Sequence, residues 1–554
     1  MKYQCGADLA RYTPGRRGIV RPKSNCAPLA SLPQGVSVRG GPSRRRAQGE
    51  TVTNGSDTAP TTGAPAEVGA QRTPKDNLVV TRHETTILGK KIAYTATAGT
   101  IVMSEEAVGE GEKAGKFEGV KPRAEVFFVA YELDGVSDKS KRPVTFSFNG
   151  GPGSSSVWMH LGLFGPKRVE LDDDGYPSAP PYRLVPNDVS LLDVTDLVFI
   201  DPVSTGYSRP VEGVKAKDFH SVDADVESVG AFIRLYTGRY GRWGSPKYLA
   251  GESYGTTRAA GLAGHLQERH GLYLNGLILV SAILDFGTAR FGPGNDLPPL
   301  LFLPTYTATA HYHGKLDAEL QALPLSVLLG RVEEFVHERY APALFLGDRL
   351  PAEERQEVAG SLARYTGLSR EYVESSDLRI DIFRFTKELL RSEGRTVGRI
   401  DSRYTGVDRD SAGEHFEFDP SMSATQGPYT ATLNDYVRGE LGFQTDLPYE
   451  ILANLYKSWS YKDVENRYLN VAETLRKAMG INPYLRVHVA NGYYDLATPY
   501  YATLHTFAHM GLTPEQRAKV SMSFYEAGHM MYVQKESLLR LRGEIERFVD
   551  DRAI

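Results

Sequence analysis

The amino-acid sequence predicts an α/β fold with a mostly parallel sheet and an inserted, mainly helical cap. Short continuous apolar runs, such as residues 197–200 and 277–280, are typical of strands buried on both faces of a parallel sheet. Segments with helical periodicity lie between these runs, and this alternation builds parallel sheets. The alternation stops near Phe291, where a long helical region follows, and it returns near Leu485.

The chain has 554 residues, of which 41% are hydrophobic and 24% are charged, with a formal net charge of -4. This composition is typical of globular proteins, and the length indicates two structured units or one large core with an insertion. The small net charge favours no class of partner.

Residues 1–77 are predicted to be a disordered, basic tail rich in Pro, Gly and Ser. Up to Lys75, 12 Lys and Arg residues face four Asp and Glu residues, and the run 44–46 is all arginine. Such a run either binds an anionic surface or nucleic acid, or is simply solvated. We expect the solvated form, with no nucleic-acid partner.

The cysteine and apolar residues restrict the cellular compartment of the protein only weakly. Cys5 and Cys26 are the two cysteines of the chain, so the region after the tail has no disulfide. No apolar run is long enough for a membrane span, and residues 1–75 lack the apolar stretch of a secretory signal. Both a cytoplasmic and a periplasmic or secreted location stay open, as does the oligomeric state.

The first part of the α/β core is predicted at residues 78–290. Strand pieces with turns are expected within 78–103, and further strands and helices follow in order. The strands lie at 124–131, 144–148, 197–200, 248–250 and 277–280, and the helices at 219–240 and 256–268.

Residues 291–478 are predicted to form the inserted cap, and 479–554 the second part of the core. The cap contains an apolar, proline-containing run at 297–303 and expected helices at 325–340 and 375–391. The second part of the core contains expected strands at 485–490 and 520–525. A closing helix at about 534–550 carries Leu538, Leu541, Ile545 and Phe548 on one face.

The pentapeptide Gly251-Glu252-Ser253-Tyr254-Gly255 has the form G-x-S-x-G. An apolar strand precedes it and a helix-forming stretch follows it, which is the context of a nucleophile elbow. The alternative is an ordinary turn of Gly and Ser residues. In the elbow, the sharp turn exposes the Ser253 hydroxyl at the carboxyl edge of the sheet.

A serine nucleophile needs a base, and the base needs an orienting acid. Asp495 follows the predicted strand 485–490, and His529 follows the predicted strand 520–525. The order Ser, Asp, His is the order of this kind of site. His529 is therefore predicted to accept the proton of Ser253, and Asp495 to orient the imidazole.

The tetrahedral intermediate needs hydrogen-bond donors. The backbone N–H of Tyr254, directly after the nucleophile, is one candidate, and the early glycine-rich loop 149–156 is the expected source of a second. A glycine-rich loop can instead hold phosphate. However, neither the G-x-G-x-x-G nor the G-x-x-x-x-G-K-[ST] pattern is present in this loop.

The loop 149–156, the motif 251–255 and Gly528-His529-Met530 together resemble the serine carboxypeptidase family, as does the stretch 201–208. The resemblance covers about residues 124–286 and 480–535. It implies the α/β-hydrolase fold and removal of single residues from peptide C-termini through an acyl-enzyme, without metal or other cofactor. It also implies residue roles: the triad Ser253, Asp495 and His529, the oxyanion donors Gly151 and Tyr254, and the carboxylate-binding residues Asn149 and Glu252.

The chain departs from the family pattern near the glycine-rich loop. Glu252 can bind a substrate carboxylate only while one of the two carries a proton. The family usually has a second glutamate after the loop, but residues 157–166 contain no acid. His160 lies there and is either a packed residue or a cation that replaces the missing acid. In addition, Ser154 replaces a usual cysteine, and Tyr532 stands where a proline often follows the histidine.

The sequence therefore predicts a serine carboxypeptidase that hydrolyses C-terminal residues of peptides. Two alternatives stay open: an acyltransferase or esterase with the same triad, and a non-catalytic partner-binding protein on this fold.

Overall fold

In the computed structural model, residues 73–109 and 111–550 are described. The predicted tail therefore lies almost entirely outside the described residues, as do Cys5 and Cys26. The first strand begins at Asn77. None of the helices between residues 73 and 550 combines the length and apolar character needed to cross a bilayer.

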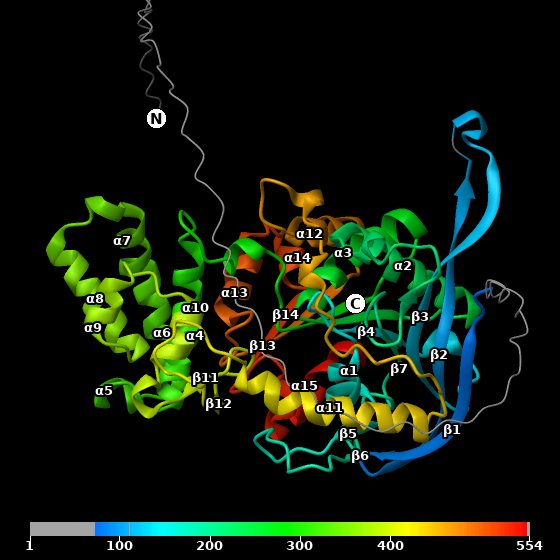
Figure 1. The fold of residues 1–554 in the computed structure, drawn as a ribbon, viewed down its shortest axis with the longest axis horizontal. Coiled ribbons are helices and arrows are strands. Elements are labelled where there is room, and N and C mark those ends of the chain that lie inside the picture. Colours follow the sequence, from blue (N-terminus) through cyan, green and yellow to red (C-terminus); the bar gives the residue numbers. More distant parts are fainter. Residues whose placement is uncertain (1–72, 110, 551–554) are drawn as a thin grey trace, which may run out of the picture. The chain divides into compact units, whose positions relative to one another are not determined.

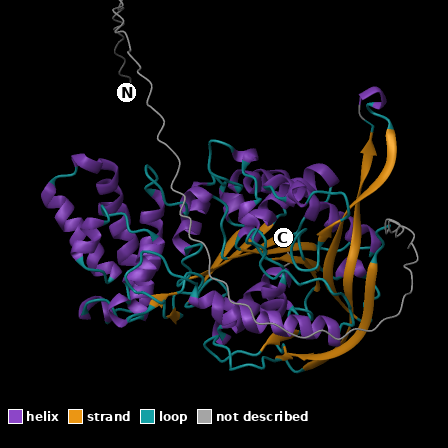
Figure 2. Ribbon diagram, in the orientation of Figure 1, coloured by secondary structure: helices purple, strands orange, loops and turns teal. Residues whose placement is uncertain are grey.

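A ten-stranded sheet runs through the molecule (Figures 1 and 2). Its order is β1-β2-β3-β7-β4-β9-β10-β13-β14, with β8 paired to β3. Strands β1 to β3 and the β3–β7 pair are antiparallel, and every pair from β7 to β14 is parallel. The bounds are β1 (Asn77–Ile87), β2 (Lys90–Val108), β3 (Phe117–Leu133), β4 (Val144–Phe148), β7 (Asp196–Ile200), β8 (Arg209–Pro210), β9 (Lys247–Glu252), β10 (Gly276–Val280), β13 (Arg486–Gly492) and β14 (Val520–Tyr525).

Helices cover both faces of this sheet. One face packs against α2 (Val222–Arg239), α3 (Tyr254–His270), α12 (Ala472–Ile481) and part of α13 (Tyr500–His509). The other face packs against α1 (Val157–Met159), α11 (Pro420–Gly439) and α15 (Lys535–Asp550). The short helix α14 (Pro514–Arg517) precedes β14. Strand β3 shows why both faces are covered, because Phe127 and Val129 belong to one core while Phe128 and Ala130 belong to the other.

A third apolar core lies within the predicted cap. Figure 1 shows its helices gathered beside the sheet. They are α4 (Leu297–Tyr312), α5 (Ala318–Gln321), α6 (Leu325–Phe335), α7 (Ala341–Leu346), α8 (Ala352–Thr366), α9 (Arg370–Ser375) and α10 (Ile382–Glu388). Two small antiparallel pairs complete the structure: β5 (Lys167–Val169) with β6 (Leu184–Pro186), and β11 (Thr396–Val397) with β12 (Thr405–Gly406).

The segment 291–478 divides between two packing environments. Its first part, up to Val397, contributes to the cap core. Its second part instead packs on the sheet, because α11 and Phe443 join one sheet face and Leu469 and Leu475 join the other. The mainly helical insertion is thus an independent core only in its first part.

Several predicted elements differ from those observed. The strand pieces expected within 78–103 are one long hairpin, β1 and β2, and β3 begins seven residues before the expected 124–131. The outer parts of these strands are exposed and lack the apolar signal of a strand. The prediction of a single helix at 375–391 is wrong, because Asp377 and Leu378 have positive φ angles of 50° and 61°, which interrupt a helix. A new helix, α10, begins after Asp381, whose carboxylate caps it by accepting the N–H of Phe383 at 2.8 Å.

Candidate active site

Ser253 occupies the turn between β9 and α3, at the carboxyl end of the parallel strands. Its φ angle of 60° places it in a region that L-residues rarely adopt. The flanking glycines are required by close contacts: a Cβ on Gly251 would lie 2.2 Å from the carbonyl oxygen of Gly255. The backbone N–H of Ser253 donates to the carbonyl of Val280 at 3.0 Å, which holds the turn against β10. The expected elbow geometry is present.

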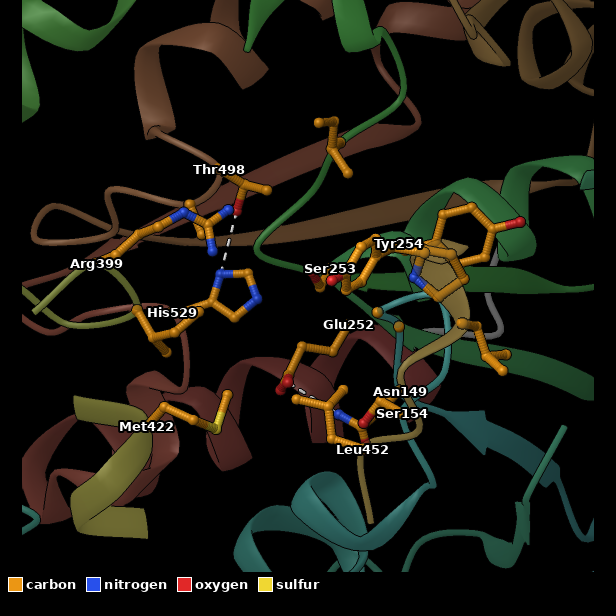
Figure 3. A pocket seen from close by; sticks show the side chains of 18 of the residues that line it. Asn149, Ser154, Glu252, Ser253, Tyr254, Arg399, Met422, Leu452, Thr498 and His529 are labelled. Atoms are coloured by element: carbon orange, nitrogen blue, oxygen red, sulfur yellow. Dashed lines mark hydrogen bonds between the residues drawn. The ribbon is translucent and has the colours of Figure 1, made fainter. Parts of the chain in front are cut away.

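Asp495 and His529 lie together after β13 and β14. The Nδ1 atom of His529 is 2.7 Å from the Oδ2 atom of Asp495, and both side chains are buried. Asp495 is held in turn by the backbone N–H groups of Ala497 and Thr498 and by the Thr498 hydroxyl, at 2.7 to 3.0 Å. Burial lowers the pKa of His529, but the neighbouring Asp495 carboxylate outweighs burial, so the net shift is upward. Ser253 and His529 line the same cavity (Figure 3).

The glycine-rich loop lies directly against the nucleophile turn. A Cβ on Gly150 would be 2.5 Å from the amide nitrogen of Tyr254, so only glycine allows this approach. Gly151 has a φ angle of 101°. Tyr254 is the first residue of α3, where backbone N–H groups have no partner within the helix. The amides of Gly151 and Tyr254 are thus placed at one edge of the cavity.

Arg258 of α3 fixes this loop from behind. Its guanidinium makes two hydrogen bonds to Asp225 of α2, at 2.8 and 3.1 Å, and one to the carbonyl of Asn149 at 2.6 Å. The Arg258 and Asp225 side chains are almost fully buried. This role of Arg258 was not predicted from the sequence, although Arg258 is a charged residue in the middle of an otherwise small and apolar helix face.

Glu252 points into the cavity beside Ser253 and is buried. Its Oε1 atom accepts a hydrogen bond from Asn149 at 2.8 Å, and its Oε2 atom accepts one from the Tyr532 hydroxyl at 2.5 Å. Burial raises the pKa of Glu252 to about 7, although His529 and these two donors act in the opposite direction. A carboxyl of this kind is protonated in mildly acidic solution without a second acid beside it.

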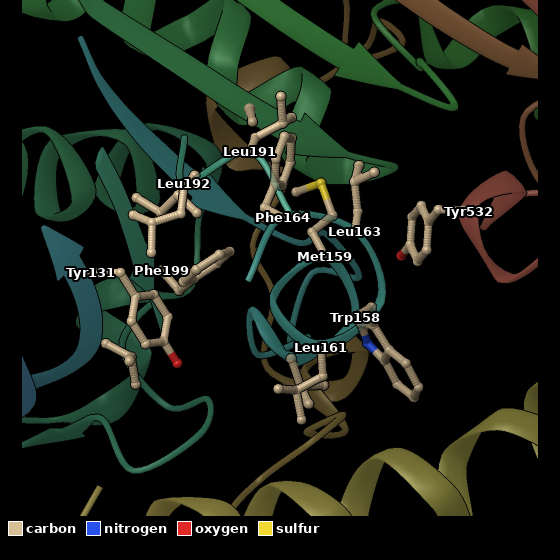
Figure 4. Close-up of a cluster of buried hydrophobic side chains, with 14 of the residues drawn as sticks. Tyr131, Trp158, Met159, Leu161, Leu163, Phe164, Leu191, Leu192, Phe199 and Tyr532 are labelled. Atoms are coloured by element: carbon tan, nitrogen blue, oxygen red, sulfur yellow. The ribbon is translucent and has the colours of Figure 1, made fainter. Parts of the chain in front are cut away.

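The missing second glutamate is not replaced by a histidine cation. His160 is 3% exposed, its ring stacks on Phe199 with 4.3 Å between centroids, and its Nε2 atom is 2.7 Å from the Tyr131 hydroxyl. Figure 4 shows Tyr131 and Phe199 within the same apolar cluster. Burial lowers the pKa of His160 to about 3, so the imidazole is neutral. The cation interpretation of His160 is wrong, and the packed interpretation is correct.

The stretch 201–208 supports the glycine-rich loop rather than the cavity itself. The Asp201 carboxylate accepts the backbone N–H of Ser156 at 2.8 Å, and burial raises the pKa of Asp201 to about 7. A Cβ on Gly206 would lie 1.7 Å from an Asp201 oxygen, and Gly206 has a φ angle of 48°. This stretch therefore positions the end of the loop and the start of α1.

A second group of residues that the sequence analysis missed lies at 399–403. The carbonyl of Ile400 accepts the N–H of His529 at 2.8 Å, and the carbonyl of Arg399 accepts the N–H of Leu496 at 3.0 Å. The Asp401 carboxylate accepts the N–H of Gly528 at 3.1 Å and pairs with Arg403 at 2.6 Å. This segment thus joins the predicted insertion to both loops that carry the acid and the base.

The shared cavity has a volume of about 810 Å³. Its lining includes the apolar and aromatic residues Leu455, Tyr456, Trp459 and Tyr461 as well as the basic residues Arg290 and Arg399. Within residues 73–109 and 111–550, no group of three His, Cys, Asp or Glu side chains is arranged to hold a metal ion.

The part of this site that comes first in the sequence is similar to known proteins. Residues 110–288 match the family model for serine carboxypeptidase. The pheromone-processing carboxypeptidase KEX1 of Yarrowia lipolytica is 32% identical over 149 residues, which are 26% of this chain and 22% of that protein. The match thus spans about a fifth of the length of this relative.

A solved structure extends the similarity in fold to most of the chain. Kex1(delta)p, a prohormone-processing carboxypeptidase from Saccharomyces cerevisiae, is similar with a TM-score of 0.51 and 17% identity. The similarity covers 82% of this chain and 91% of that one, and at this identity it establishes the fold alone. The predicted α/β-hydrolase fold is confirmed. The region that matches the family model for serine carboxypeptidase contains the glycine-rich loop and the Ser253 turn.

Proposed function

We propose that this protein is a serine carboxypeptidase that removes C-terminal residues from peptides through a Ser253 acyl-enzyme. The observation that carries the proposal is the placement of the buried Asn149–Glu252 pair in the same cavity as Ser253 and His529. An esterase needs only the nucleophile, the base and the oxyanion donors. A buried carboxyl with a pKa near 7, one residue from the nucleophile, suits recognition of a free peptide C-terminus.

In the proposed reaction, His529 accepts the proton of Ser253 while the hydroxyl oxygen attacks the scissile carbonyl carbon. Asp495 keeps the imidazole in the tautomer that presents Nε2 to the serine and stabilises the imidazolium. The N–H groups of Gly151 and Tyr254 donate to the oxyanion. His529 then gives the proton to the leaving amine. In the second half of the reaction, water attacks the acyl-enzyme, and His529 accepts the proton of this water and returns it to Ser253.

Glu252 acts while protonated. Its carboxyl donates a hydrogen bond to the carboxylate of the substrate, and Asn149 donates to Glu252 and orients it. The bound carboxylate itself raises the pKa of Glu252 further, because two adjacent carboxyl groups do not both ionise. The chain thus obtains from burial what the family pattern obtains from a pair of acids.

The test compares one peptide with a free C-terminus and the same peptide with a C-terminal amide, with mass spectrometry as the readout. We expect stepwise loss of residues from the free peptide, slow or absent loss from the amide, and no loss with Ser253→Ala. Cleavage within the peptide, or turnover of simple esters alone, contradicts the proposal. A fluorophosphonate that labels the wild type but not Ser253→Ala excludes a non-catalytic binding protein.

A further inference from the structure

The guanidinium of Arg399 faces the cavity and has no ion-pair or hydrogen-bond partner among the described residues. Arg399 follows β11 and lines the cavity, and Figure 3 shows its side chain directed toward Thr498 and His529. Among residues 73–109 and 111–550, no carboxylate lies within 4.0 Å of this guanidinium, and no hydrogen bond from it is formed.

The carboxylates near Arg399 already accept hydrogen bonds from other groups. Asp419 accepts the backbone N–H groups of Arg399, Ile400 and Ser421 and the Ser421 hydroxyl. Asp495 is occupied by His529, Ala497 and Thr498. Both carboxylates attract the Arg399 charge through space, whereas Arg290 repels it.

The charges around the cavity are asymmetric. Arg290, Arg399 and His529 contribute basic groups, and Glu252 is the one carboxyl among the described residues of the lining. Arg290 is exposed and lies over the Phe286 ring, 5.5 Å from its centroid. Because Glu252 is largely protonated below pH 7, the cavity has an excess of positive charge in mildly acidic solution.

We propose that Arg399 is a specificity residue that binds a carboxylate of the peptide substrate. A planar guanidinium can hold a carboxylate through two parallel hydrogen bonds, and such charge-assisted pairs are stronger than neutral ones. This inference rests on the proposed function. The bound group is either the side chain of an acidic residue near the C-terminus or the main-chain carboxylate itself, and both have the same chemistry.

The experiment uses peptides with a blocked N-terminus and a free C-terminus. They differ only in one residue, which is Glu, Gln, Leu or Lys at the last or at the penultimate position. For the preferred position we expect wild-type kcat/KM to be about tenfold higher with Glu than with Gln, which corresponds to about 1.4 kcal/mol. Arg399→Gln should reduce this ratio to about twofold or less, and Arg399→Lys should retain part of it. High salt should also reduce the ratio, because the charges are partly accessible to solvent.

Arg395→Gln is the matched control. Arg395 lies four residues upstream, is exposed, bonds to Thr405 and does not line the cavity. Its replacement should leave the ratio of Glu to Gln turnover unchanged. Arg290→Gln should lower the ratio less than Arg399→Gln does, because the exposed Arg290 charge is more strongly screened.

The outcomes separate the two sources of the carboxylate. A loss confined to Glu-containing peptides in Arg399→Gln identifies the side chain. A rise in KM of equal size for all the peptides, with little change in kcat, identifies the main-chain carboxylate. Unchanged ratios and unchanged KM overturn the proposal. An equal fall in kcat alone also overturns it, because Arg399 would then act only through Asp495 and His529.

A binding measurement separates this inference from the proposed function. Calorimetry with Ser253→Ala compares Glu- and Gln-containing peptides without turnover, and repeats the comparison in Ser253→Ala/Arg399→Gln. Peptide turnover in the wild type, together with affinities that are the same for every peptide in Ser253→Ala and in Ser253→Ala/Arg399→Gln, would reject the role of Arg399 while leaving the carboxypeptidase intact. Absence of all peptide turnover would reject the carboxypeptidase itself, and peptide affinities unaffected by Arg399→Gln would then reject the role of Arg399 as well.

Discussion

The side chain of Glu252 connects the proposed chemistry to pH. Its pKa of about 7 arises first from burial, and the Tyr532 hydroxyl and Asn149 amide limit the shift. His529 must be neutral to accept a proton, and Glu252 must be protonated to donate one. Because the two groups interact, we expect a bell-shaped dependence of kcat/KM on pH whose two limbs belong to the pair.

Glu252→Gln should flatten one limb of that dependence. The amide donates a hydrogen bond at every pH, so KM should stay constant as the pH rises through 7, whereas the wild-type KM should increase. Tyr532→Phe removes a donor that lowers the pKa of Glu252, so it should move the wild-type increase to higher pH. Steady-state kinetics from pH 5 to 9 measures both. A KM profile in Glu252→Gln that matches the wild type would refute the carboxylate role.

Glu252→Gln should also change the free energy of unfolding within a defined pH window. The pKa of Glu252 is raised from 4.5 to about 7 in the folded state. Its contribution to stability is therefore complete below pH 4.5 and is lost as the pH rises to 7. Relative to the wild type, Glu252→Gln should gain about 3 kcal/mol in the free energy of unfolding across this window, and no more above it. Denaturant titrations at pH 4 and pH 8 provide the comparison.

At the scale of the elements, α2 and α3 hold the glycine-rich loop through one buried ion pair. Arg258 of α3 contacts Asp225 of α2 and the carbonyl of Asn149, and lies over the rings of Phe148 and Tyr254. The Ser253 turn and the glycine-rich loop thus share one support.

Arg258→Met should therefore impair both stability and catalysis. Removing one partner leaves the Asp225 carboxylate buried and unpaired, which costs about 3–5 kcal/mol in the free energy of unfolding. In the protein that stays folded, kcat should fall by about 10- to 100-fold, because the loop that carries Gly151 loses its anchor. Arg234→Met on the exposed face of α2 is the control and should change neither quantity. An unaltered kcat in folded Arg258→Met would show that the Arg258–Asp225 pair does not position the glycine-rich loop for catalysis.

At the scale of the whole molecule, the insertion is joined to the sheet at the site. The cap core includes Tyr494, Leu496 and Tyr500, which lie on either side of Asp495. Residues 399–402 also bond to the loops of Asp495 and His529. The positions of the acid and the base therefore depend on the packing of residues far from the sheet in sequence.

Arg403→Met tests this dependence. Arg403 pairs with Asp401, both side chains are at most 6% exposed, and Asp401 receives the N–H of Gly528 beside His529. We expect a loss of about 3–5 kcal/mol in the free energy of unfolding, together with a lower kcat. Arg409→Met, which breaks a pair with Glu417 at the surface of the same insertion, should have almost no effect. Destabilisation with a wild-type kcat would show that the insertion supports folding but not the triad.

The central sheet could be predicted from local sequence. Strands β7 and β10 are short apolar runs, whereas β4 and β14 alternate apolar residues with Thr or Ser. The observed bounds of all four agree with the predicted ones within a residue. The Ser253 turn was predictable for a similar reason, because the strand, the glycines and the helix that form it are adjacent in the chain. The break between α9 and α10 was not, since composition does not report a positive φ angle at Asp377.

The sequence by itself determined the order of the candidate site residues along the chain: a glycine-rich loop, then Ser253 in a strand-to-helix turn, and Asp495 and His529 after later strands. Tertiary structure alone decided the ionisation of these groups and the partners around them. Tyr532 reaches Glu252 across 280 residues of sequence, His160 is neutral because it is buried, and Arg399 arrives from the insertion. Burial and electrostatic contact are properties of the packed molecule, since they depend on residues that the chain brings together only when it folds.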